Sequence, residues 1–559
     1  MRDTVRRRTQ GPRGVALLAL LALLATACGS TAYRDRQIAI AAGGLDNASA
    51  PPIALGGGTT GHPDPTVAPT ERGSGADGVD NTTGEVAADT GTTTTTPGSG
   101  RTSGGTTTGT TGPPRGTTAP PGGTTVDPPG GTDDNPPGAS LPQSAENSRG
   151  VTDDEIRVGF LWISSFQTLG SQAGFQAPAK GDVDAQTRTL VKWINDNGGI
   201  AGRTVVPVIR SFPQEESSPG LEQQFCNKFA DDDQVFAVML VGQLQEATRF
   251  CYASKRVLHF ETTAYAYDST LFEQAAPYYW SLATPAIDQA LRALPGLLQG
   301  QQFFDPMPGR DETQTAVGVV MWDTPYAKRL FQRDLQPALA AVGQDVAVLR
   351  TVDGSTIGTM QKGLTDAIVA FRNAGVNRVF FIGNAPLAPF FMNQAENEGY
   401  RPRYALTSAD QPRFAADPGG GKVPLQARDA VGLGYQPEVD VEDDQYPWPD
   451  PNNETEQLCM QVLTAGGHQW SARKNASIAF GYCGGLLMLK KGAETITDGV
   501  TPELWAHHAE HNLVGFESPL NFGSTFGPGD HAGPDTYRLL KWFADCECFK
   551  YVGDPARFS

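Results

Sequence analysis

The 559-residue sequence lacks a long apolar run and lacks an excess of basic residues. It has 43 Lys and Arg against 61 Asp and Glu, a formal net charge of −18. Nucleic-acid binders normally carry a basic patch, so this acidity argues against a nucleic-acid partner. No apolar run reaches the roughly 18–20 residues that span a bilayer, which excludes an integral transporter. Hydrophobic residues make up only 39%, but the deficit is confined to one region near the N-terminus, which excludes a wholly disordered chain.

The first 27 residues have the pattern of an export signal. Five arginines precede a short apolar run at 15–25, and the small residues Thr26 and Ala27 come directly before Cys28. A basic region, a short apolar core and small residues at the cut are typical of such signals. Cys28 at this point resembles a bacterial lipobox, which implies a mature protein held to the outer face of the cell membrane by lipid chains on Cys28. The alternative is an ordinary secretory signal that contains a cysteine by chance.

Residues 28–150 predict a disordered tether. They consist mainly of Gly, Thr, Pro, Ser and Asp, with an unbroken threonine run at 92–96. Such a segment has too little apolar surface to offset the entropy of ordering. A flexible chain of this length reaches about 60 Å, enough to carry a domain away from a membrane.

From residue 151 onward, the pattern predicts alternating strands and helices. Pro207 weakens the second strand or places it at a sheet edge. The expected strands are 155–162, 205–210, 235–241, 257–260, 316–321, 346–350, 379–382 and 404–406. One expected helix ends at residue 197. The others cover residues 221–229, 246–256, 326–342, 360–371 and 387–398. Two such runs imply an α/β protein with two doubly wound lobes, whose ligand lies in an interlobe cleft at the carboxyl ends of the strands.

Four segments in the right order carry a resemblance to a known family. They are 151–159, 193–203 (WINDNGGIAGR), 323–326 (DTPY) and 518–522 (SPLNF). Residues 151–559 thereby resemble the type I periplasmic solute-binding proteins of ABC transporters, the branched-chain amino-acid receptor family. The resemblance implies three crossovers between the lobes, with lobe one at about 155–285 and 434–530 and lobe two at about 286–433 and 531–559. It also implies closure of the lobes around a solute.

The resemblance also implies ligand contacts. Thr262 and Thr263 stand where the family binds an α-carboxylate, and Asp410 where an acid pairs with the ammonium group. Tyr326 matches an aromatic residue that closes on the ligand from lobe two. Each residue also has a simpler interpretation, since the threonines and Asp410 can cap local turns and Tyr326 can be a packing residue.

Three positions have less specific roles. Gln243 and Gln245 stand where the family has a Gly- and Ser-rich turn, which argues against a simple branched-chain amino acid as the solute; both can also be solvated loop residues. Trp162 lies where the family presents an aromatic wall, and Asn384 follows a strand of lobe two. The complete ligand-binding set is therefore Trp162, Gln243, Gln245, Thr262, Thr263, Tyr326, Asn384 and Asp410.

Six cysteines remain besides Cys28, and an even number in an exported protein predicts disulfides. They are Cys226, Cys251, Cys459, Cys483, Cys546 and Cys548. Six cysteines allow fifteen pairings. The family often has a bridge at the position of Cys226 with Cys251. A pair of Cys459 with Cys483 is the next expectation, and Cys546 with Cys548 would close a very small ring.

One motif favours an enzyme instead. The stretch His507 to His511 fits H-x-x-E-H, a zinc peptidase pattern in which Glu510 would be the base. The simpler interpretation is a solvated helix that is rich in histidine. No G-x-S-x-G or P-loop motif is present. The expectation is a monomeric, non-enzymatic receptor, without cofactor or metal, that delivers a small polar solute, such as an amino acid or amide, to an ABC permease. A sensory receptor without transport is the third alternative.

Overall fold

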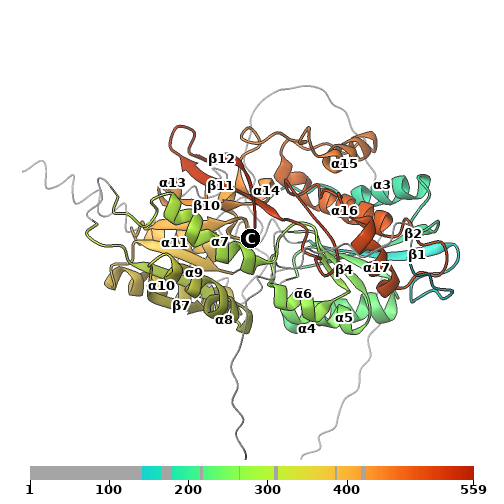
Figure 1. Ribbon diagram of the computed structural model, residues 1–559, viewed down its shortest axis with the longest axis horizontal. Helices are drawn as coiled ribbons and strands as arrows, with labels where there is room; N and C mark the ends of the chain where they lie inside the picture. Colours follow the sequence, from blue (N-terminus) through green and yellow to red (C-terminus); the bar gives the residue numbers. More distant parts are fainter. Residues whose placement is uncertain are drawn as a thin grey trace, which may run out of the picture. The chain divides into compact units, whose positions relative to one another are not determined.

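The computed structural model describes residues 141–164, 178–213, 218–243, 245–263, 265–307, 312–383, 387–416 and 424–558 (Figure 1). The expected signal peptide, Cys28, the tether up to residue 140 and Asn384 lie outside these residues. Within the described ranges, no helix combines the length and apolarity needed to cross a membrane.

The first sheet is entirely parallel, with the strand order β2-β1-β3-β4-β5. Pro207 lies on β2, which is an edge strand, so the edge placement predicted from this proline is confirmed. An edge tolerates proline because one side of the strand has no hydrogen-bond ladder to complete. The strands are β1 (Glu155–Ile163), β2 (Thr204–Phe212), β3 (Ala237–Leu240), β4 (Leu258–Glu261) and β5 (Tyr279–Ser281).

Helices from two separate parts of the chain surround this sheet. The apolar face of α3 holds Leu190, Val191 and Ile194 in one core with β1, β3 and residues of α16 and α17. Asp182 begins α3 because its side chain accepts a hydrogen bond from the Ala185 backbone N–H. The helices are α3 (Val183–Asp196), α4 (Pro219–Asn227) continued by the π-helical η2 (Lys228–Asp232), α5 (Glu246–Ser254), α6 (Ser269–Ala275), α15 (Glu454–Ala465), α16 (Arg473–Gly492) and α17 (Pro502–Asn512).

The second sheet has the order β12-β11-β10-β9-β8-β6-β7. Its parallel strands are β6 (Val317–Trp322), β7 (Val346–Val352), β8 (Arg378–Ile382), β9 (Arg403–Thr407) and β10 (Val431–Gly434). An antiparallel hairpin that the sequence analysis did not foresee, β11 (Thr536–Phe543) and β12 (Cys548–Arg557), extends the sheet beyond β10. The two sheets together confirm the predicted α/β class with two doubly wound parts.

The helix expected at 326–342 is divided into three pieces. A π-helical turn separates α8 from α9, and Pro337 lies in the first turn of α9, where a missing N–H costs little. The helical elements of this half are α7 (Ile287–Gly300), α8 (Pro325–Leu330), η3 (Phe331–Leu335), α9 (Gln336–Ala341), α10 (Ile357–Asn373), α11 (Leu387–Asn397), the 3-10 turn η4 (Ser408–Asp410), α12 (Pro412–Ala416), α13 (Pro424–Ala427) and α14 (Pro437–Asp440).

The last residues of the expected tether lie against the folded part. The Gln143 side chain donates to the Thr495 carbonyl oxygen (2.9 Å), and the Ser148 backbone N–H donates to the Val500 carbonyl oxygen (2.9 Å). The ordered domain therefore begins before residue 151, because these backbone and side-chain groups find partners near the start of α17.

Three disulfides are present among the described residues. Cys226–Cys251 joins α4 to α5, and Cys459–Cys483 joins α15 to α16. Cys546–Cys548 closes the turn between β11 and β12. The cysteines of the first two bridges lie in the core that packs around the first sheet.

Candidate functional site

Four of the predicted ligand residues lie at one edge of the first sheet. Trp162 is near the end of β1, Gln243 follows β3, and Thr262 and Thr263 follow β4. Because β1, β3 and β4 are parallel neighbours, their carboxyl ends meet at the same edge. Both threonine hydroxyls already donate within the protein, Thr262 to the Leu240 carbonyl oxygen (2.8 Å) and Thr263 to the Glu261 carboxylate (2.7 Å).

Two further predicted residues follow strands of the second sheet. Tyr326 lies in α8 after β6, and Asp410 ends η4 after β9. The Asp410 carboxylate accepts hydrogen bonds from the backbone N–H (2.7 Å) and the hydroxyl (3.0 Å) of Thr407, so it caps its own turn. Burial raises the pKa of Asp410 to about 7, although the two Thr407 donors oppose this shift.

Hydrogen bonds directly join residues at the carboxyl ends of the strands in the two sheets. The Tyr326 hydroxyl donates to the carbonyl oxygen of Ala266, which follows β4 of the first sheet, over 2.6 Å. Arg329, one turn further along α8, donates to Asp268 (2.7 Å) and to Glu246 at the start of α5 (2.9 Å). The carboxyl ends of the two sheets therefore face each other across Tyr326 and Arg329.

Several polar groups near the carboxyl ends of β3 and β4 are buried. Gln243 has no solvent exposure, which makes the solvated-loop interpretation of this residue wrong. Gln245 caps α5, and its backbone N–H donates to Glu222 (3.0 Å). Arg249 of α5 and Glu261 of β4 form an ion pair in which both side chains are fully buried. Arg249 also donates to the Gln245 carbonyl oxygen (3.3 Å), so these groups hold the backbone at the start of α5.

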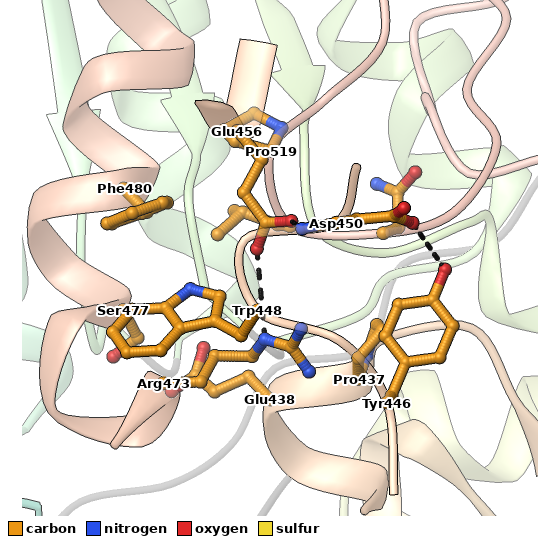
Figure 2. Close-up of a pocket in the computed structure, with 12 residues that line it drawn as sticks. Pro437, Glu438, Tyr446, Trp448, Asp450, Glu456, Arg473, Ser477, Phe480 and Pro519 are labelled. Carbon is orange, nitrogen blue, oxygen red and sulfur yellow. Dashed lines mark hydrogen bonds and ion pairs between the residues drawn. The ribbon is translucent and has the colours of Figure 1, made fainter. Parts of the chain in front are cut away.

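A pocket lies beside this edge region, with an empty volume of about 370 Å³ (Figure 2). It is bordered by α14, by the loop between α14 and α15, by the first turns of α16 and by residues 519–521. Aromatic and charged side chains share its wall, among them Tyr446, Trp448, Phe480, Glu438, Glu456 and Arg473. None of the seven described residues predicted for the ligand site belongs to this wall.

The charged groups of the pocket are held by a local network. The Tyr446 hydroxyl donates to Asp450 (2.6 Å), and the Asp450 backbone N–H donates to Glu456 (2.6 Å). Arg473 donates to the Pro447 carbonyl oxygen, and its guanidinium carbon lies 5.4 Å from the centre of the Tyr446 ring. Burial raises the pKa of Glu456 to about 7, because Arg473, at 3.7 Å, compensates for only part of the lost hydration.

The sequence contained a signal for this pocket that the pattern analysis missed. Aromatic residues alternate with prolines in Tyr446-Pro447-Trp448-Pro449, in the loop between α14 and α15. Proline restricts the backbone and so holds neighbouring rings at low entropic cost. Arg473, which also lines the pocket, is recognisable only from the fold, since it begins a helix after a separate loop.

The H-x-x-E-H stretch lies on α17, but its groups have other partners. The Nδ1 atom of the motif residue His511 lies 2.9 Å from the His507 carbonyl oxygen. His508, at a variable position of the motif, is hydrogen-bonded to the Thr495 hydroxyl (2.6 Å) and to the Pro142 carbonyl oxygen. The Glu510 carboxylate is hydrogen-bonded to His531 (2.9 Å). Over the part of the chain that the structure describes, no cluster of three or more His, Cys, Asp or Glu residues could hold a metal ion.

Comparisons with known proteins find structural likeness only. No protein-family model and no curated protein sequence matches the chain. A branched-chain amino-acid ABC transporter protein from Thermus thermophilus with bound valine has a TM-score of 0.51 at 14% identity, covering 73% of this chain and 97% of that one. A fatty-acid ABC transporter substrate-binding protein from Thermomonospora curvata has a TM-score of 0.51 at 13% identity, covering 75% and 96%. A solute-binding protein from Rhodopseudomonas palustris in complex with 3,4-dihydroxybenzoic acid has a TM-score of 0.50 at 12% identity, covering 73% and 98%.

The chain therefore has the fold of the type I periplasmic substrate-binding proteins, as the resemblance in its sequence predicts.

Proposed function

We propose that this protein is an extracellular, lipid-anchored solute-binding receptor that delivers a small polar solute, an amino acid or an amide, to an ABC permease. The observation that carries the proposal is the contact between the two strand edges, where the Tyr326 hydroxyl donates to the Ala266 carbonyl oxygen. Ligands of doubly wound sheets bind at these edges, and contacts from both sides exist only when the edges are close. The lipobox at Cys28 supports the anchor, and the tether supports reach beyond the membrane.

The two lobes that we propose to close on the solute are residues 155–285 with 434–530 and residues 286–433 with 531–559. A solute that contacts both lobes stabilises the closed arrangement because it binds that arrangement more tightly than the open one. Arg329 contributes to the same equilibrium without a solute, because it bridges α8 to Asp268 and Glu246. A permease in the membrane would recognise the closed form of the receptor.

The proposed solute contacts are the residues at the strand ends, with Asp410 as the partner of an ammonium group. An ammonium group beside Asp410 would favour the ionised carboxylate and so oppose the effect of burial on its pKa. Thr262 and Thr263 donate their hydroxyl hydrogens internally, but their oxygens retain lone pairs that can accept a hydrogen bond. In this arrangement they suit a donor group of the solute better than its carboxylate.

Proteins with this fold support the size class of the solute. The Thermus thermophilus protein was solved with valine and the Rhodopseudomonas palustris protein with 3,4-dihydroxybenzoic acid. Both are small molecules with a polar group and an apolar body. We carry over only this size and character, and we favour an amino acid or amide because Asp410 offers a buried carboxylate.

The test is a thermal-shift and scattering screen of the mature protein with the common amino acids, their amides and their deaminated analogues. A bound solute should raise the melting temperature and leave a compact scattering profile. Asp410→Asn should weaken an ammonium-bearing solute about tenfold or more, while its deaminated analogue should bind the variant and the wild type equally. Failure of the whole panel to shift either measurement would refute the proposal, and equal loss for both solutes would reduce Asp410 to a structural cap.

A further inference from the structure

The pocket beside the strand edges contains two buried hydrogen-bond donors for which the described residues offer no acceptor. Among the described residues, no acceptor is found for Arg473 Nη1 or for the Trp448 indole Nε1–H, and both atoms are buried. Arg473 itself is only 6% exposed. A buried donor without an acceptor is costly, and a buried guanidinium group more so.

Both donors belong to side chains in the wall of the same pocket. In Figure 2 the guanidinium group of Arg473 points into the space between the rings of Trp448 and Tyr446. Its other nitrogens are accounted for differently: Nη2 donates to the Pro447 carbonyl oxygen, and Nε lies 3.7 Å from Glu456, too far for a hydrogen bond. The arginine is therefore held by Nη2, and the described residues give its Nη1 no acceptor.

The acidic residues around the pocket do not take this donor. Asp450 accepts from the Tyr446 hydroxyl (2.6 Å) and from the Asn452 backbone N–H (2.9 Å). Glu456 accepts from the Asp450 backbone N–H (2.6 Å). Glu438 lies at 3.7 Å from Lys180. None of these three carboxylates therefore supplies the acceptor for Arg473 Nη1, and a bound molecule would supply one to Arg473 and Trp448.

The wall also has an apolar side. The rings of Phe480 and Trp448 lie with their centroids 5.8 Å apart, and Pro519 and Leu520 border the same space. A ligand that satisfies both halves has an anionic acceptor at one end and an apolar body at the other.

We infer that this pocket is a binding site for a small organic acid, whose carboxylate accepts hydrogen bonds from Arg473 Nη1 and Trp448 Nε1 and whose apolar body packs on Phe480. Guanidinium and carboxylate groups match in charge and in planar geometry. The site is distinct from the proposed solute site at the strand ends, since none of the described residues of that site lines it. A protonated Glu456, favoured by the raised pKa of this residue, would not repel the anion.

The experiment measures binding of benzoate to the mature protein by calorimetry and by the change in tryptophan fluorescence. Benzamide has the same shape without the charge, and we expect it to bind about tenfold more weakly or worse. Trp448→Phe keeps an aromatic ring but removes the N–H, and Arg473→Lys keeps the charge but removes the planar fork. Each substitution should weaken the binding of benzoate about tenfold.

The matched control is Trp470→Phe. Trp470 also packs against Phe480, with centroids 6.2 Å apart, but it does not belong to the pocket wall. This variant should bind benzoate as the wild type does. Absence of benzoate binding to the wild type, or unchanged binding to a folded Trp448→Phe, would overturn the inference. Asp410→Asn separates the two sites, because it should leave benzoate binding unchanged whether or not an amino acid binds at the strand ends.

Discussion

The buried histidine of β4 leads to a quantitative prediction about acid stability. His259 has no solvent exposure, and its ring stacks on Tyr279 with centroids 5.0 Å apart and lies 5.4 Å from the ring of Tyr252. Its Nδ1 lies 3.1 Å from the Val257 carbonyl oxygen. Burial lowers the pKa of His259 from 6.5 to about 3, and the nearby charge of Arg249 acts in the same direction.

The direction of the pH effect on stability follows from the difference between the pKa of His259 in the folded chain and in the unfolded chain. Because the unfolded chain binds this proton more readily, the free energy of unfolding falls as the pH drops below the unfolded value of about 6.5. The loss continues until the pH reaches the folded pKa of about 3. Between pH 8 and pH 5 this single group should lower the free energy of unfolding by about 2 kcal/mol.

Urea denaturation at pH 8, 7, 6 and 5 of the wild type and of His259→Phe measures this term. Phenylalanine keeps the stacked ring but cannot be protonated, so the wild type should lose about 2 kcal/mol more than the variant between pH 8 and 5. Other titrating groups are common to both proteins and cancel in the difference. Tyr279→Phe is the control, because it changes the same stack and keeps the imidazole. Parallel pH profiles for wild type and His259→Phe would refute the reasoning.

Three further predictions concern the ion pairs and the histidine-rich helix. Glu261→Gln leaves Arg249 buried and without its carboxylate, and it should lower the free energy of unfolding by about 3–5 kcal/mol in chemical denaturation; a loss below about 1 kcal/mol would show that the pair is solvated. Arg329→Gln removes the bridges to Asp268 and Glu246, and small-angle scattering should show a larger radius of gyration without solute; an identical profile would mean that other contacts hold the edges together. Treatment with a chelator should leave the melting temperature unchanged, whereas stoichiometric zinc in the purified protein would restore the peptidase alternative.

Local patterns were enough to predict most of the parallel framework. A strand covered on both faces is continuously apolar, and β3 and β8 consist of such buried runs. Pro207 indicated its own place at a sheet edge, because a missing N–H is a local property. The β11–β12 hairpin was not foreseen, since its half-buried strands lack a continuous apolar run.

The candidate site was predicted less completely for a physical reason. Strand order brings Trp162, Gln243 and Thr262 to one edge, and the sequence can indicate that edge because it depends only on where each strand ends. Which hydroxyl or carboxylate is free depends instead on partners distant in the sequence. Thr262 donates to the end of β3, and the wall around Arg473 combines the segments near residues 438, 448 and 520.

The sequence by itself determined the α/β class, the acidic net charge and the strand ends at which polar residues gather, and it predicts an export signal. These follow from composition and from periodicities that act over a few residues. Only the tertiary structure decided that Tyr326 meets Ala266 from the other sheet and that Arg249 and Glu261 form a buried pair. It also decided that Trp448 and Arg473 share a pocket in which the described residues leave a donor of each without an acceptor. Burial and hydrogen-bond satisfaction are properties of the packed chain, because each group's partner is chosen by the fold and not by its neighbours in sequence.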